Sequence, residues 1–384
     1  MPSGKPTLRD VAKAAGVSPM TASNALHGKP GVKDSTRAKV LAVAEKLDYR
    51  INLTASMLKS GRSNIIHIIV NEFDSPFYSK LVESLVTETT ERGLTPFVEQ
   101  TRYSPDAAKH ALANPFSGQL FDGEIIHASG LNAGVPLSAI NHGRPLVLID
   151  ACEETPTFDT VNFPNEDGAR AAVQHLIECG CHRIAIVGDG YSPRTELAHV
   201  ESSSGLRLRG ASGALLDAGL PYDESTNFIG YGSVSGIEAG HAIAEAMLAV
   251  RAQSADDTAE SCSSDATQAE GSTPAIDGIF CINDYAAFGV IRGLADYGIR
   301  VPDDVRVIGF DGATAGSYTT PTLSTVQVDL DQLAQFALDM ITRRVEQRDQ
   351  GDGRSDESAG MPATRATIGY TLVPRESTVG SANR

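Results

Sequence analysis

The sequence contains no tryptophan, and aromatic residues make up only 6% of its 384 residues. It also lacks long hydrophobic runs, since none approaches the roughly 20 apolar residues that a membrane-spanning helix requires. The first residues, MPSGKPTLRDVAK, have neither the apolar segment nor the small-residue cleavage site of a secretory signal. These absences predict a cytoplasmic protein with no membrane partner.

Cysteine is scarce and irregularly spaced. The number is odd and fits no disulfide framework, which indicates reduced thiols. One cluster, Cys179, Cys181 and His182, could form half of a metal site, but no second pair of ligands follows at a zinc-like spacing. We therefore expect no metal and no cofactor. The cysteines are Cys152, Cys179, Cys181, Cys262 and Cys281.

Catalytic motifs are also missing. The sequence has no G-x-S-x-G nucleophile elbow, no P-loop and no H-E-x-x-H zinc motif. The glycines of VGDG at 187–190 do not form a dinucleotide-binding fingerprint. An enzyme is therefore not expected.

Acidic residues outnumber lysine and arginine by 48 to 32, which gives a net charge of −16. The excess is uneven, because residues 1–63 hold eleven basic and four acidic residues, a net of +7, and residues 64–384 carry −23. A basic segment attached to an acidic body is the distribution expected of a DNA-contacting head. The chain is also too long for one ordinary core and indicates two or three domains.

From Asn64 onward, short apolar runs alternate with amphipathic helical stretches. This pattern is typical of an α/β fold in which helices cover both faces of parallel sheets, and its length allows two such subdomains. The polar segments 251–274 and 347–364 are expected to be disordered surface insertions. The predicted strands are 65–70, 95–100, 123–128, 145–150, 183–189, 278–283 and 305–311, and the predicted helices include 78–92, 166–179, 207–218 and 285–297.

Residues 7–47 predict three short helices. Thr7 can cap the first helix with Asp10 bonding back to it, and Gly16 supplies a tight turn. Ser18 caps the second helix and Pro19 takes its first position. The third helix is expected over 35–47, with its core face formed by Val40, Leu41, Ala44 and Leu47.

The second helix has two different faces. Ala22, Ala25 and Leu26 are expected to be buried, whereas short polar side chains point outward. Any small three-helix bundle could show such helices, but the close alanine-rich packing and the short polar outer face favour a helix-turn-helix that places this helix in the major groove.

The segment TLRDVAKAAGVSPMTASNALHG, followed by YRINLTASMLKSGRS, resembles the head and hinge of the lac-repressor (LacI/GalR) family of bacterial regulators. The likeness continues through DSPFYSKLV, FDGEII, PLVLID, GCHRIAIVGD, NDYAAFGVIRGL, GIRVPDDVRVIGFDG, TTPTLSTV and VPREST. The resemblance implies a three-helix head on a periplasmic-binding-protein-like body made of two Rossmann-like parallel-sheet subdomains. It also implies a double-stranded DNA operator, a small-molecule effector and a homodimer as partners.

For DNA binding, the resemblance places Pro19 and Met20 at base edges and Thr21 and Ser23 at the phosphate backbone. Asn24 stands where the family usually has arginine, so an amide suited to adenine replaces a guanine reader. The stretch 52–60 matches a hinge helix that orders on the minor groove, in which Leu58 would wedge between base pairs. Ile51 stands where the family has proline. The residues expected to contact DNA are Thr7, Ser18, Pro19, Met20, Thr21, Ser23, Asn24, Asn52, Ala55, Leu58 and Lys59.

Polar residues follow several of the predicted strands, and ligands bind at the carboxyl ends of strands in such folds. Asp150 follows PLVLI, Asn283 and Asp284 follow GIFCI, and Asp311 follows VRVIGF. Any of these carboxylates could instead be a turn or helix cap. The resemblance adds cleft-lining aromatic residues and an arginine that anchors effectors, while the loop 190–205 aligns poorly and leaves Ser203 uncertain. The expected effector-binding residues are Phe77, Tyr78, His127, Asp150, Arg207, Tyr231, Asn283 and Asp311.

These observations predict a sequence-specific transcriptional repressor that binds a palindromic operator as a dimer. Its effector is expected to be a sugar, with a nucleobase or nucleoside as the alternative. A solute-binding protein of a transporter would share the body but would need export and would lack the head, and a constitutive DNA-binding protein would use the body only to dimerise.

The expected domain organisation has four parts. Residues 1–50 form the head and 51–63 the hinge. Residues 64–377 form the effector-binding and dimerisation body, and 378–384 a tail that is too short for a coiled coil. Within the body we expect an N-subdomain over 64–163 and 328–346 and a C-subdomain over 164–327 and 365–377.

Overall fold

The computed structural model describes residues 6–26, 28, 30–49, 62–113, 120–129, 131, 137–141, 143–229, 236–260, 275–350 and 362–380. The chain divides into two compact units, and the division falls between Ser63 and Asn64. Asn52, Ala55, Leu58 and Lys59 of the predicted hinge, and Tyr231 of the predicted cleft, lie outside the described residues. No helix within the described ranges is long and apolar enough to cross a membrane.

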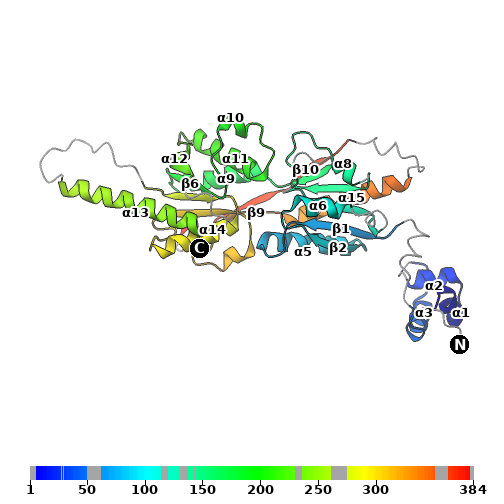
Figure 1. Ribbon diagram of the computed structural model, residues 1–384. Coiled ribbons are helices and arrows are strands. Elements are labelled where there is room, and N and C mark those ends of the chain that lie inside the picture. Colours follow the sequence, from blue (N-terminus) through cyan, green and yellow to red (C-terminus); the bar gives the residue numbers. More distant parts are fainter. Residues whose placement is uncertain are drawn as a thin grey trace. The chain divides into compact units, whose positions relative to one another are not determined.

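The described part of the first unit contains three helices packed around a small alanine-rich core (Figure 1). The predicted capping box is confirmed: the Thr7 hydroxyl accepts a hydrogen bond from the Asp10 N–H, and the Asp10 carboxylate accepts one from the Thr7 N–H at 2.9 Å. Gly16 ends the helix with a φ of 67°, and the Ser18 hydroxyl caps the next helix by accepting from the Thr21 N–H at 3.0 Å. The helices are α1 (Leu8–Ala15), α2 (Pro19–Leu26) and α3 (Asp34–Lys46).

The predicted core face of α3 is partly wrong. Val40 and Ala44 are buried, but Leu41 and Leu47 are 47% and 37% exposed. Leu41 follows Val40 by one residue and therefore lies about 100° farther around the helix, outside the narrow stripe that faces α1 and α2. Leu26 at the end of α2 is half-buried.

The described strands of the body form two sheets, each with helices on both faces (Figure 1). In the first sheet the described strands run in the order β10-β5-β4-β3-β1-β2, all parallel. Ile66 and Ile68 of β1 face one helical layer, whereas Ile69 faces the other, because successive strand residues point to opposite sides. The elements are β1 (Ile65–Val70), α5 (Pro76–Glu91), β2 (Thr95–Gln100), α6 (Pro105–Ala113), β3 (Gly123–His127), α8 (Leu137–Ile140), β4 (Leu146–Ile149), β5 (Asp159–Asn162), α15 (Leu330–Gln350) and β10 (Arg365–Thr367).

In the second sheet the described strands run in the order β11-β9-β8-β7-β6. The sheet is parallel except for the edge strand β11, which pairs antiparallel with β9 and departs from the expected all-parallel arrangement. The elements are α9 (Asn165–Glu178), β6 (Ile184–Val187), α10 (Arg194–Leu197), α11 (Ser203–Asp217), α12 (Glu224–Asn227), α13 (Ile237–Glu260), β7 (Gly278–Cys281), α14 (Asp284–Asp296), β8 (Arg306–Asp311), the 3-10 turn η1 (Thr314–Ser317), β9 (Ser324–Val328), β11 (Tyr370–Val373) and α16 (Glu376–Val379).

The placement of residues 365–377 entirely in the C-subdomain is wrong. Arg365–Thr367 pair with β5 in the first sheet, and only the later residues join the second sheet. Where the chain returns to the first sheet, buried Asp159 accepts hydrogen bonds from the Thr364 N–H at 2.7 Å and from the guanidinium of Arg344 at 2.8 Å.

Parts of the two segments predicted to be disordered, and one residue of the predicted tail, have defined structure. Residues 251–260 continue helix α13, and residues 347–350 continue α15, whereas 261–274 and 351–361 lie outside the described residues. Thr378, assigned to the tail, is buried and its hydroxyl is 2.9 Å from Nε2 of His175. It therefore belongs to the body.

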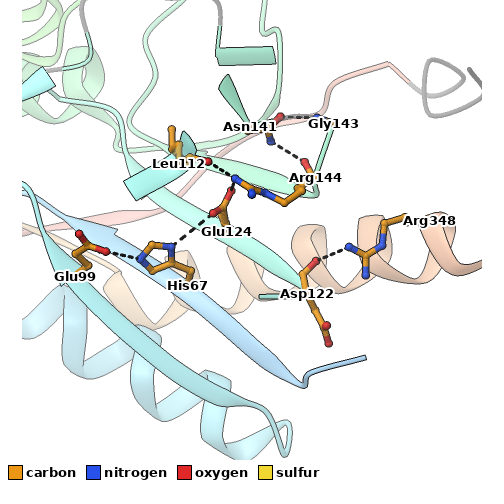
Figure 2. A network of polar contacts seen from close by, with 9 residues as sticks. All are labelled: His67, Glu99, Leu112, Asp122, Glu124, Asn141, Gly143, Arg144 and Arg348. Atoms are coloured by element: carbon orange, nitrogen blue, oxygen red, sulfur yellow. Dashed lines mark hydrogen bonds and ion pairs between the residues drawn. The ribbon is translucent and has the colours of Figure 1, made fainter. Parts of the chain in front are cut away.

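A buried polar network occupies the amino-terminal end of β3, opposite the end that carries His127 (Figure 2). Glu124 is fully buried, with one carboxylate oxygen 3.1 Å from Arg144 Nη2 and the other 3.6 Å from His67 Nδ1. His67 Nε2 reaches the half-exposed Glu99 at 3.2 Å. The guanidinium of Arg144 compensates a carboxylate that would be costly to bury alone.

Candidate functional site

The first candidate site is the amino-terminal end of α2. Ala22 and Ala25 are fully buried against α1 and α3, which fixes the opposite face outward. Pro19 and Met20 lie on that outer face, and Met20 is 70% exposed, a large apolar side chain with no intramolecular reason to face solvent. This is the geometry of a helix that presents its first turn to another surface.

The remaining predicted DNA contacts surround this turn. The hydroxyls of Ser18 and Thr21 lie 2.8 Å apart at the helix start, while Ser23 and Asn24 are half-buried farther along. The hydroxyl of Thr7 donates to Asp10 at 2.6 Å, so its main structural task is to cap α1. Within the described head, the six predicted contacts from Ser18 to Asn24 therefore form one short segment, and Thr7 lies at the start of the neighbouring helix.

The second candidate site is a cleft of about 590 Å³ in the body. It opens at the carboxyl ends of β1, β3 and β4 on one side and of β7 and β8 on the other, and the first turns of α5, α11 and α14 close it. A volume in this range suits a small molecule. The predicted residues that line it are Phe77, Tyr78, His127, Asp150, Arg207, Asn283 and Asp311.

Arg207 on α11 is held at the centre of the cleft by protein groups. Its Nε donates to Oδ1 of Asn165 at 2.8 Å, its Nη1 donates to the carbonyl of Ile282, and the same nitrogen lies 3.3 Å from Asp311. Its guanidinium carbon also lies 3.8 Å from the centre of the Phe310 ring. These contacts fix the plane of the guanidinium before any ligand enters.

Asp150 is positioned from two sides. One carboxylate oxygen accepts from Asn165 Nδ2 at 2.8 Å and the other accepts from the Ser203 hydroxyl, so Ser203 lies in the site although its alignment was uncertain. Asn283 caps α14, since its side-chain oxygen accepts from the Ala286 N–H at 2.8 Å. Its amide nitrogen is the group left to face a ligand.

Burial changes the acidity of two aspartates at the second sheet. Burial raises the pKa of Asp311 to about 6, although the adjacent Arg207 lowers it. Burial and repulsion from Asp311 raise the pKa of Asp284 to about 8, while bonds from Thr325 and the Ala313 N–H oppose the change. Asp311 has a φ of 110°, a region that side-chain-bearing residues rarely adopt and that concentrates at functional sites.

His127, at the end of β3, is buried among aromatic rings. Burial lowers its pKa to about 4, so the ring is neutral at physiological pH. Its Nδ1 accepts from the Ser129 N–H at 3.3 Å, which places the ring proton on Nε2. The Tyr78 ring lies 5.1 Å away, and the Tyr78 hydroxyl accepts from Asn71 at 2.9 Å.

Sequence reasoning missed several lining residues. Glu72 and Asp74 lie in the loop after strand β1, and Tyr103 lies in the loop after β2, at the carboxyl edge of the sheet where Asp150 follows β4. The rule that identified Asp150 would therefore have found them. Asp284, noted only as a strand-end candidate, also lines the cleft, with Tyr285 and Phe288 on the same helix. Among the described residues, no group of three or more His, Cys, Asp or Glu side chains is arranged to hold a metal ion.

Two family descriptions match the chain. "Bacterial regulatory proteins, lacI family" matches residues 7–52, and "Periplasmic binding protein-like domain" matches residues 173–378. The first match covers the helix-turn-helix. The second covers the strands of the second sheet and also β10 of the first sheet.

Full-length relatives extend this match. The chain is 30% identical over 351 residues to the HTH-type transcriptional regulator CelR of Thermobifida fusca, covering 88% of this chain and 92% of the relative. It is similar to the solved structure of a transcriptional regulator CelR–cellobiose complex (25% identity, TM-score 0.59, 97% and 99% of the two chains). It is also similar to the lac repressor dimer bound to operator and the anti-inducer ONPF (25% identity, TM-score 0.70, 98% and 99%). The chain therefore belongs to the lacI family of bacterial regulatory proteins, as a DNA-binding, effector-binding transcriptional regulator and not an enzyme.

Proposed function

We propose that the chain is a repressor that binds a palindromic operator as a homodimer and that a sugar in the cleft controls this binding. The observation that carries the proposal is the preorganised Arg207, flanked by Asp150 and Asp311 at the centre of a cleft of about 590 Å³. Carboxylates and a fixed guanidinium provide the acceptors and donors that sugar hydroxyls need.

The aromatic side chains of the cleft support the same ligand class. Phe77 and Tyr285 line it from opposite subdomains and offer apolar faces on which a sugar ring can rest. The CelR structure to which the chain is similar contains cellobiose, and the lac repressor structure is a dimer bound to operator. These relatives favour a sugar effector, a dimer and repression for this chain.

In the proposed mechanism, the effector bridges the two subdomains of the body and favours one angle between them. Because the head is attached to the first subdomain through the linker before β1, that angle determines how two heads are spaced on a two-fold symmetric operator. The effector acts only to the extent that it binds the two states differently.

A nucleobase or nucleoside is the second candidate, favoured by the same aromatic residues. The two classes are separated by measuring the thermal stability of the full chain with a panel of neutral sugars and a panel of nucleobases and nucleosides. We expect a sugar to raise Tm in a concentration-dependent way and to change retention of DNA sites selected from a random library. Stabilisation by nucleobases alone would replace the sugar, and selection of no DNA sequence would contradict operator binding.

A further inference from the structure

The cleft carries more negative than positive charge. Its described lining includes five carboxyl groups, those of Glu72, Asp74, Asp150, Asp284 and Asp311, against the single guanidinium of Arg207. Burial raises the pKa of Asp284 to about 8 and that of Asp311 to about 6, so the excess of negative charge rests chiefly on the other three. Three of the five are bonded inside the protein: Asp150 by Asn165 and Ser203, Asp284 by Thr325 and a backbone N–H, and Asp311 by Arg207. Arg207 is itself engaged by protein acceptors, so an anionic ligand would meet a field of like charge.

The other two carboxylates, Glu72 and Asp74, lie together at the rim between β1 and α5. Burial raises the pKa of Glu72, the Tyr103 hydroxyl opposes this by donating to its carboxylate at 3.2 Å, and the neighbouring Asp74 raises it further. Neither carboxylate has an ion pair among the described residues, and the nearby Lys80 is paired with Glu83 at 2.9 Å. A cation at this rim would relieve the repulsion between the two carboxylates.

An unpaired donor in the same cleft is a second, independent indication of a ligand. His127 is 95% buried and lines the cleft, yet its Nε2 has no hydrogen-bond partner. Because Nδ1 is the acceptor, Nε2 carries a proton, and a buried N–H without an acceptor is costly. The Tyr78 ring lies 5.1 Å from His127 and 6.1 Å from Tyr103, so a continuous aromatic wall links this donor to the acidic rim.

We propose that the effector is a sugar carrying a protonated amino group, which Glu72 and Asp74 bind while His127 Nε2 donates to one of its oxygens. This inference rests on the proposed function of the cleft and adds the charge of the ligand. In this arrangement the ammonium group lies at the acidic rim and the sugar ring packs against the aromatic wall. The neutral histidine donates to a hydroxyl or ring oxygen. Phosphorylated sugars should bind more weakly than their parents, since the single guanidinium of the described lining, that of Arg207, already shares its Nε and Nη1 with protein acceptors and lies next to Asp311.

The test is calorimetric titration of the full chain at about pH 6, where sugar amines are charged. Glucosamine, galactosamine and mannosamine are each compared with the parent hexose, the N-acetyl derivative and the 6-phosphate. At least one amino sugar should bind about tenfold or more tightly than its own parent and N-acetyl derivative, because those lack the charge. Its 6-phosphate counterpart should bind more weakly than the parent.

Three variants locate the effect. The double substitution Glu72→Gln with Asp74→Asn should remove the preference for the amine, so that the amino sugar and its parent hexose bind this variant with equal affinity. Glu91→Gln, which alters an exposed carboxylate at the end of α5 outside the cleft lining, is the matched control and should retain the preference. His127→Phe should weaken amino and parent sugars by the same factor.

Equal affinity for amino and parent sugars, tighter binding of a phosphate, or an amine preference that survives the double substitution would each overturn the inference. A neutral sugar that binds and changes operator affinity without any amine preference would leave the proposed function standing. Absence of binding by every sugar in the panel would overturn both.

Discussion

At the scale of the residue, we propose that Asn24 gives the head a base preference that differs from that of typical relatives. It lies on the outer half of α2, one turn beyond the exposed Pro19 and Met20, and its side chain is half-buried. A short amide can donate and accept at an adenine edge, whereas arginine prefers guanine. Asn24→Arg should therefore shift the preferred base at one position of each half-site, with a discrimination of about 1–3 kcal/mol.

Selection from a random-site library followed by sequencing measures this change. Lys13→Ala, an exposed substitution near the end of α1 outside the predicted contacts, should leave the selected sequence unchanged. Identical selected sites for wild type and Asn24→Arg would remove Asn24 from base recognition.

Asp284 makes a prediction about stability. Its pKa is about 8 in the folded chain against an ordinary value of 3.8, so the folded state holds a proton that the unfolded state releases. The folded state is therefore favoured most below about pH 4, and this contribution falls by about 1.4 kcal/mol per pH unit as the pH rises toward 8. Asp284→Asn retains both hydrogen bonds, since an amide can donate to Thr325 and accept from the Ala313 N–H.

Urea unfolding of the full chain between pH 5 and 9 tests the point. The difference in unfolding free energy, Asp284→Asn minus wild type, should increase toward alkaline pH and level off above pH 8. Asp106→Asn, at a side chain that is 95% exposed, is the control and should give a flat difference. A flat difference for Asp284→Asn as well would show that its carboxyl titrates normally.

At this scale, the sequence could predict which side chains follow buried strands but not how they are engaged. Asp150, Asn283 and Asp311 were identified because carboxyl ends of parallel strands meet at one edge. That Arg207 is held by Asn165 depends on a contact across 42 residues of chain that no local pattern contains. The cap that Asn283 provides spans only 3 residues and is a local signal. Glu72 was overlooked although it obeys the same rule as Asp150.

At the scale of the element, β3 joins two polar environments. Its carboxyl end presents His127 to the cleft, and its amino end holds Glu124 in the buried network with His67 and Arg144 (Figure 2). Asp122, just before the strand, accepts from the Asn64 N–H at 2.8 Å, where the chain enters the body. Strand β3 thus connects the cleft with the point at which the linker ends and the body begins.

The network predicts a non-additive response to substitution. Arg144→Met should cost about 3–5 kcal/mol, because it leaves the fully buried Glu124 carboxylate without its guanidinium partner. The double variant Arg144→Met with Glu124→Gln should recover about 1–3 kcal/mol of that loss. Lys109→Met, which removes an exposed ion pair with Asp106, should cost less than about 1 kcal/mol. Additive effects of the two network substitutions would contradict a coupled buried pair.

The elements themselves were largely predictable, because continuous apolar strands and cap residues are local signals. The strands 65–70 and 95–100 have the predicted bounds, and α2 begins at Pro19 and ends at Leu26. The wrong predictions concern segments whose structure local composition does not indicate. Strand β10 pairs in the first sheet, next to Asp159, and residues 251–260 extend a helix despite their polar composition.

At the scale of the whole molecule, the charge is divided between the two units. Residues 1–63 carry +7 and residues 64–384 carry −23, so the basic unit is suited to phosphate and the acidic body is repelled by it. The cleft shares the acidic character of the body. The charge pattern therefore supports DNA contact through the head and a ligand without negative charge in the body.

The central claim is that occupancy of the cleft changes DNA binding by the head. The most direct measurement is the affinity of the full chain for its selected operator, by fluorescence anisotropy, with and without the stabilising sugar, for wild type and Arg207→Ala. We predict a change of about 5- to 150-fold in wild-type operator affinity, and none in Arg207→Ala, which should still bind the operator. A sugar that binds the cleft of the wild-type chain without changing its operator affinity would contradict the account.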